Sequence, residues 1–105
     1  MKNKQERRRR IQERIPCNLD LEINDSIVCK AFDISEGGMY ILTNHVFKPG
    51  SVVKISFLFS NEKIEIRSKI KYCHEGVGIG IMFIDLDDAQ KDKIKEIIKV
   101  IKQST

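Results

Sequence analysis

Residues 18–34, NLDLEINDSIVCKAFDI, decide the fold, because apolar and polar side chains alternate on both sides of a short polar break. In NLDLEI the aliphatic residues Leu19, Leu21 and Ile23 occupy every second position, which is typical of a strand buried on one face. The NDS break favours a tight turn. IVCKAFDI is therefore predicted to return as the antiparallel partner of the first strand.

The same alternation predicts four further strands along the chain. They are MYILT (39–43), SVVKISFLF (51–59), EKIEIRSKIKYC (62–73) and VGIGIMFI (77–84). In the third of these, Ile64, Ile66, Ile70 and Tyr72 are expected on one face, with Ser68 between them.

Short connections rich in turn residues separate these segments. In KPG, for example, Gly50 is expected to adopt a positive φ. Six short strands with such connections predict a small antiparallel β-barrel over residues 16–86, whose closure removes exposed edges. Gly78 and Gly80 are expected at a barrel corner or where another part of the chain approaches the backbone closely.

The periodicity changes at Asp87, which can cap a helix. Apolar residues then recur at i, i+3, i+4 and i+7, namely Ile94, Ile97, Ile98 and Ile101. This spacing predicts an amphipathic helix over residues 87–103. Its stripe covers only about two heptads and lacks Trp and Phe, which favours packing across an open end of the barrel over a coiled coil or a membrane surface.

Length and composition predict a single globular domain, since the 105 residues are 41% hydrophobic and 32% charged. No apolar run approaches the roughly 20 residues of a membrane span, and no signal peptide is predicted. Cys17, Cys29 and Cys73 are odd in number and far apart, which favours free thiols in the cytoplasm. His45 and His74 lack companions at metal-ligand spacing, so no metal site is predicted.

Positive charge is concentrated at the N-terminus. Residues 1–14 contain seven Lys or Arg and two Glu, a net charge of +5, whereas the remaining residues contain twelve basic and thirteen acidic side chains. The body of the protein is thus slightly acidic, and we expect an anionic partner to meet the N-terminal arm first.

No catalytic motif is present, which predicts a binding module rather than an enzyme. The acidic run of Asp85, Asp87 and Asp88 is interpreted as the start of the helix rather than as a set of metal ligands.

Two short motifs carry the candidate site. Arg10 and Arg14 have the i, i+4 spacing that lets two guanidinium groups converge on phosphate oxygens or on a guanine edge. In DISEGG, Asp33 and Ser35 lie where a strand must turn. These residues could line a ligand-binding rim beside Gly38, or simply bond nearby amides while Gly37 or Gly38 takes a positive φ.

Taken together, RIQER before Ile-Pro and a strand, DISEGG after the second strand, and GVGIGIMFIDL before the terminal helix resemble the PilZ domain family. That resemblance covers residues 6–103 and implies a PilZ-type barrel with a flexible basic arm, residues 1–15, that clamps cyclic di-GMP. The resemblance implies that Arg10 and Arg14 contact the phosphates and the O6/N7 edge of guanine. It also implies that Arg9, just before the motif, favours an intercalated pair of ligand molecules, with help from Arg8.

The resemblance also assigns roles on the barrel. Asp33 would accept hydrogen bonds from the N1–H and amino edge of guanine, Ser35 would add a hydroxyl contact and Gly38 would permit close approach. The chain has no Trp, so Tyr72 or Met82 would have to stack on guanine.

The predicted function is a cyclic di-GMP receptor and adaptor that requires no cofactor and relays its signal to an unidentified effector protein by ordering its arm. One alternative is a ligand-independent protein-interaction domain of PilZ fold. The other is a small barrel that binds nucleic acid, which the acidic body and the 7% aromatic content disfavour.

Overall fold

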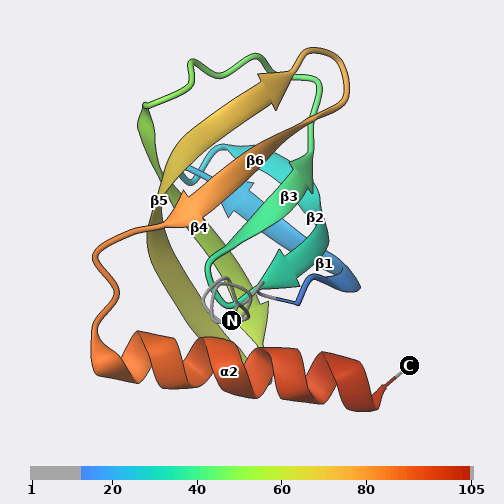
Figure 1. The fold of residues 1–105 in the computed structure, drawn as a ribbon, viewed down its shortest axis with the longest axis vertical. Helices are drawn as coiled ribbons and strands as arrows, with labels where there is room; N and C mark the ends of the chain where they lie inside the picture. The colour runs from blue at the N-terminus through green and yellow to red at the C-terminus, as the bar shows by residue number, and fades with distance from the viewer. Residues whose placement is uncertain (1–12, 105) are drawn as a thin grey trace, which may run out of the picture.

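The structure is a computed structural model that describes residues 13–104 (Figure 1). The expectations about Arg8, Arg9 and Arg10 lie outside the described residues. Six strands and one helix are described: β1 (Ile15–Ile23), β2 (Ile27–Ser35), β3 (Gly38–Leu42), β4 (Val52–Phe59), β5 (Glu62–His74), β6 (Gly78–Phe83) and α2 (Asp88–Gln103).

The strands form a closed barrel in the order β1-β2-β3-β6-β5-β4, and every neighbouring pair is antiparallel. The predicted six-stranded antiparallel barrel is therefore confirmed. β1 already includes Ile15 and Pro16, although Pro lacks the N–H that a strand ladder uses. The pairing of β1 with β2 shifts register just after Pro16, and proline is tolerated at such irregularities.

Aliphatic side chains from all six strands fill the barrel. Ile23, Ile41, Ile55 and Ile79 are completely buried, as the alternating pattern requires. The sequence prediction for β5 is wrong at one position, because Tyr72 does not share the buried face of Ile66 and Ile70. A register shift between Ile70 and Tyr72 directs the tyrosine ring to the outer surface, where 41% of the residue is exposed.

Helix α2 lies across one end of the barrel (Figure 1). Asp87 accepts a hydrogen bond from the Gln90 amide, and the Gln90 side chain accepts one from the Asp87 amide, so the predicted cap is confirmed as a reciprocal capping box. Ile94 and Ile97 are buried in the same core as the strands. The amphipathic helix therefore packs on the barrel, as its periodicity predicted.

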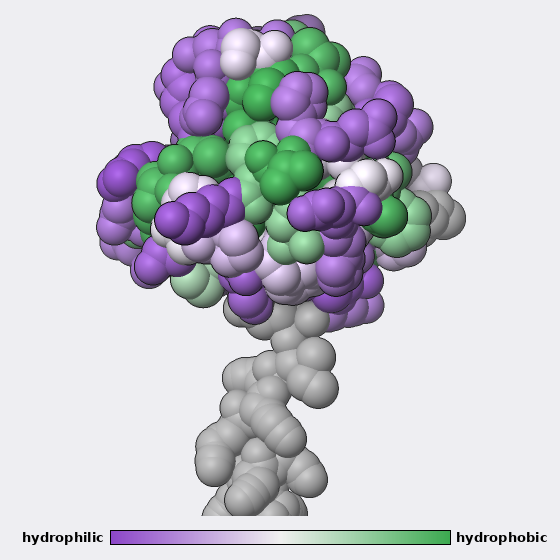
Figure 2. Space-filling model, turned by 90° about the horizontal axis from the view of Figure 1, so that it is seen from above, coloured by the Kyte–Doolittle hydropathy of each residue, from purple (hydrophilic) through white to green (hydrophobic). Residues whose placement is uncertain are grey.

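The end of the barrel opposite α2 is covered by the connections 43–51 and 75–77 (Figure 1). Its surface is partly apolar (Figure 2). Gly50 has a φ of 93°, which confirms the conformation predicted for the KPG turn. Within residues 13–104, no helix has the length and apolar character needed to span a bilayer.

Candidate functional site

Pairing of β1 with β2 brings the two sequence motifs together. Ile15 lies opposite Ile34 and Pro16 opposite Asp33. Arg14, the residue just before β1, therefore lies beside the DISEGG segment. The Nε and Nη2 atoms of Arg14 donate to Oδ1 of Asp33 at 3.2 and 2.9 Å. The arginine side chain is 47% exposed and the aspartate side chain 19%, so the pair lies at an open rim.

A bulge aims the Asp33 side chain toward this rim. The register of β2 against β3 shifts between Ala31 and Asp33, which interrupts the strict alternation that would point Asp33 inward with Ala31. Oδ1 of Asp33 also accepts from the backbone N–H of Tyr40 at 3.2 Å. Within residues 13–104, Oδ2 has no hydrogen-bond partner and remains available as an acceptor.

Ser35 and Gly38 stabilise the turn that joins β2 to β3. The buried Ser35 hydroxyl accepts from the N–H of Gly37 at 3.3 Å and donates to the carbonyl of Gly38 at 3.5 Å. A Cβ atom on Gly38 would lie 2.0 Å from the carbonyl oxygen of Ile81, so the approach of β6 leaves no room for a side chain. The ligand contacts that the resemblance assigns to Ser35 and Gly38 stay predictions.

The alternative explanation of the two glycines by positive φ is wrong. Among the described glycines, only Gly50 and Gly76 have positive φ. The close approach of two strands, rather than a left-handed turn, requires glycine at position 38.

The strand register extends from Asp33 into a row across four strands. Asp33 lies opposite Tyr40, Tyr40 opposite Gly80, and Gly80 opposite Tyr72. A Cβ on Gly80 would lie 2.3 Å from the Tyr72 ring, so the missing side chain lets this ring lie over the β6 backbone. The row therefore joins a carboxylate to two outward-facing aromatic rings.

An aromatic cluster surrounds the end of this row. The centroids of Tyr40 and Tyr72 are 6.3 Å apart, those of Tyr72 and His74 are 5.0 Å apart, and Phe32 meets Tyr40 edge-on at 6.4 Å. The Tyr40 hydroxyl and Nδ1 of His74 are 2.9 Å apart. Burial, followed by the proximity of Tyr72, raises the pKa of Tyr40, so its hydroxyl remains protonated at neutral pH.

Sequence reasoning identified Tyr72 but missed the other aromatic residues of the cluster, which are Phe32, Tyr40 and His74. They come from three different strands, β2, β3 and β5, so neither spacing nor periodicity within one strand reveals that they meet. The signal was Gly80, because a glycine inside a strand often accommodates an aromatic ring from a neighbouring strand. Met82, the other candidate for stacking, lies opposite Gly38 and is 38% exposed.

Comparison with known protein families identifies the family to which this chain belongs. The profile of the PilZ domain family matches residues 3–99. This chain belongs to the PilZ domain family. PilZ domains are binding and adaptor domains rather than enzymes. A search of the curated proteins gives no match.

Solved structures with low sequence identity share the fold. The PilZ domain of CeSA from a cellulose-synthesising bacterium is 22% identical, with a TM-score of 0.67 over 86% of this chain and 98% of that chain. The Bacillus subtilis inhibitor of motility, MotI/DgrA, is 15% identical, with a TM-score of 0.74 over 92% of this chain and 53% of that chain.

Borreliella burgdorferi PlzA, solved in complex with c-di-GMP, is 21% identical, with a TM-score of 0.62 over 88% of this chain and 42% of that chain. This PilZ chain thus spans about half of the motility inhibitor and less than half of PlzA.

Proposed function

We propose that this PilZ chain is a receptor for cyclic di-GMP and that its ligand binds at the Arg14–Asp33 rim. The contact between Arg14 and Asp33 is the observation that carries the proposal, since it unites one residue from each motif at an exposed edge. The family assignment supports the same ligand class, as does the c-di-GMP complex of PlzA.

The groups at the rim match the chemistry of a guanine with an attached phosphate. Oδ2 of Asp33 accepts from the N1–H and amino edge of guanine, while the fork of Arg14 donors suits a phosphate or the O6/N7 edge. Tyr72 supplies a ring at the other end of the row for stacking. Arg9 and Arg10 of the arm would add further donors from the sequence motif, and Ser35 and Gly38 stabilise the β2–β3 turn that follows Asp33.

Arg14 must leave Asp33 to bind the ligand, and breaking this ion pair costs little free energy. Partly exposed ion pairs contribute about 0–1 kcal/mol, so releasing Arg14 from Asp33 sacrifices little stability. A hydrogen bond from a charged donor to phosphate contributes about 1.5–3 kcal/mol. The balance therefore favours the ligand-bound arrangement whenever several such bonds form together.

Isothermal titration with cyclic di-GMP, and with cyclic di-AMP as the competing dinucleotide, tests the proposal. We expect cyclic di-GMP alone to bind, with a dissociation constant of about 1 μM or lower. Arg14→Ala and Asp33→Ala should each weaken binding by at least about tenfold, the equivalent of one charged hydrogen bond. Arg67→Ala is the matched control, because Arg67 also pairs with an exposed aspartate, Asp85, and neither residue belongs to the two motifs.

Absence of binding by titration and by a second method would overturn the proposal and leave a ligand-independent PilZ domain. Equal binding of both dinucleotides would also contradict it, because Asp33 is assigned to an edge that is specific to guanine. Loss of affinity in Arg67→Ala as well would show that the effect reflects general charge rather than this site.

We further propose that the bound ligand holds the arm, residues 1–15, against the barrel and so changes the surface offered to an effector protein. Limited trypsin digestion measures this directly, since Arg7 to Arg10 supply cleavage sites. Cyclic di-GMP is expected to slow cleavage there in the parent protein and to have no effect in Asp33→Ala. Equal cleavage with and without ligand would contradict the clamp while leaving the receptor assignment intact.

A further inference from the structure

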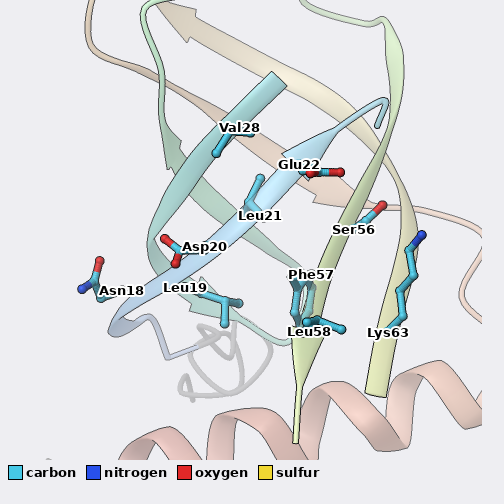
Figure 3. A pocket seen from close by; sticks show the side chains of 10 residues that line it. All are labelled: Asn18, Leu19, Asp20, Leu21, Glu22, Val28, Ser56, Phe57, Leu58 and Lys63. Carbon is cyan, nitrogen blue, oxygen red and sulfur yellow. The ribbon is translucent and has the colours of Figure 1, made fainter. Parts of the chain in front are cut away.

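The pairing of β1 with β4, which closes the barrel, is the shortest of its six strand pairings. β1 and β4 pair at only two positions, Glu22 with Ser56 and Ile23 with Ile55, whereas β4 and β5 pair at eight. Beyond Glu22 and Ser56 the two strands diverge (Figure 3). Each therefore has a stretch without a strand partner on that side among residues 13–104.

The backbone groups that face the open seam follow from the pairing. The Asn24 N–H donates to the carbonyl of Lys54 across the seam, and in an antiparallel pair every second residue repeats that direction. Counting from this bond, Asp20 of β1 and Leu58 of β4 point their N–H and C=O groups into the open seam. These are free edges of the kind that receive an added strand.

The open seam forms a groove of about 550 Å³. Leu58, which is largely exposed, and the partly buried Leu19 supply its accessible apolar surface, whereas Leu21 and Phe57 are almost fully buried beside them. Figure 3 shows these side chains between and beside the diverging strands. A volume of this size accommodates a short stretch of polypeptide side chains.

One buried polar atom in the groove also lacks a partner. Ser56 lines the groove and is 4% exposed, and its hydroxyl has no hydrogen-bond partner within residues 13–104. Buried hydroxyls normally form at least one hydrogen bond. This oxygen has almost no accessible surface, so a guest would reach it only if β1 and β4 part further at Ser56.

Acidic side chains border the groove. The Glu22 carboxylate lies at its closed end and has no hydrogen-bond or ion-pair partner among the described residues. Asp20 already pairs with Lys30, and Lys63 with Glu65. The unpaired charge that the groove offers is therefore negative, which favours a guest with a basic side chain opposite Glu22.

We propose that the β1–β4 seam is a docking site for an extended segment of a partner protein, which adds to the β1 edge as a strand. The segment carries apolar side chains for Leu19 and Leu58, and a Lys or Arg for Glu22. Main-chain bonds to Asp20 supply the affinity, and the apolar and acidic groups select the sequence. We take this partner to be the effector protein of the proposed function, and to that extent the inference rests on that function.

The test uses a displayed library of random dodecapeptides selected on the whole protein, followed by titration of an enriched synthetic peptide. Asp20→Pro removes the N–H that faces the seam, and the pairing with β2 does not use that N–H. Asp20→Ala is the matched control, which removes the carboxylate but keeps the N–H. We expect binding to weaken by about tenfold or more in Asp20→Pro and by less than about threefold in Asp20→Ala, the former being the equivalent of one hydrogen bond.

Hydrogen exchange on the unmodified protein provides a measurement that does not depend on how the proline variant folds. The bound peptide should slow exchange of the Asp20 amide, and Glu22→Lys should weaken binding of peptides that carry a basic residue. No enriched peptide, or protection that maps to another face, would overturn the proposal. A dimer whose interface protects Asp20, detected by light scattering, would overturn it in favour of a second copy of this chain.

Titration of cyclic di-GMP into the same variants separates the two proposals. Asp20→Pro is expected to bind the dinucleotide as the parent does, because Asp20 lies outside the Arg14–Asp33 rim. Peptide binding without dinucleotide binding would overturn only the receptor assignment, and the reverse result would overturn only the docking site.

Discussion

Replacing Gly38 with alanine should destabilise the barrel even though the position belongs to a ligand-binding motif. The new Cβ would lie 2.0 Å from the Ile81 carbonyl oxygen, where ordinary contact begins at about 3.4 Å. The β3 and β6 backbones must therefore separate by more than 1 Å at a place where both are hydrogen-bonded. Overpacking of this kind reduces the free energy of unfolding by about 3 kcal/mol, which lowers the melting temperature of a domain this size by roughly 10–20 °C.

Urea denaturation followed by circular dichroism measures the change, and Gly50→Ala is the control. Gly50 has a positive φ, but a Cβ atom added there would meet nothing within 4 Å, so its substitution introduces only backbone strain of about 1 kcal/mol. We expect Gly38→Ala to be clearly the less stable variant. If it unfolds within about 0.5 kcal/mol of the parent, the argument from close strand approach is wrong. Loss of cyclic di-GMP binding in such a stable variant would then assign Gly38 to the ligand.

Three further predictions concern the helix cap, a buried thiol and the aromatic row. Asp87→Ala removes the capping box and should reduce stability by about 1 kcal/mol in a thermal melt, whereas Asp88→Ala, which has no capping bond, should change it by less than about 0.5 kcal/mol. Burial raises the pKa of Cys29 to about 11 from 9.0, so stability should fall as the pH rises from 9 towards 11, and Cys29→Ala should remove that part of the pH dependence in urea titrations. Gly80→Ala should displace the Tyr72 ring and weaken cyclic di-GMP binding several-fold, with a smaller loss of stability than a backbone clash causes; unchanged affinity would exclude Tyr72 as the stacking residue.

Most of the fold could be predicted from sequence because it depends on local periodicity. Alternation in NLDLEI and IVCKAFDI predicted the first hairpin, and the change of period at Asp87 predicted the helix and its cap. The failure at Tyr72 has a specific cause. A bulge inserts one residue into the ladder, and nothing in the local pattern of EKIEIRSKIKYC signals that the register shifts after Ile70.

The motifs by themselves marked Arg14 and Asp33, which the strand pairing brings into contact. The DISEGG pattern left open whether glycine served a positive φ or the close approach of a ligand, and it did not predict the packing of Gly38 against β6 that the structure shows.

The sequence by itself thus determined the strands, the helix, the barrel class and the charged residues of the candidate site, because each depends on neighbours within a few positions. Only the tertiary structure decided that Tyr40, which lies opposite Asp33, gathers with Tyr72 and His74, and that the β1–β4 seam remains open below Glu22 and Ser56. Both features depend on register between strands distant in the chain. That register is set by the packing of the whole core and by bulges, and one shifted residue moves a side chain from the interior to the surface.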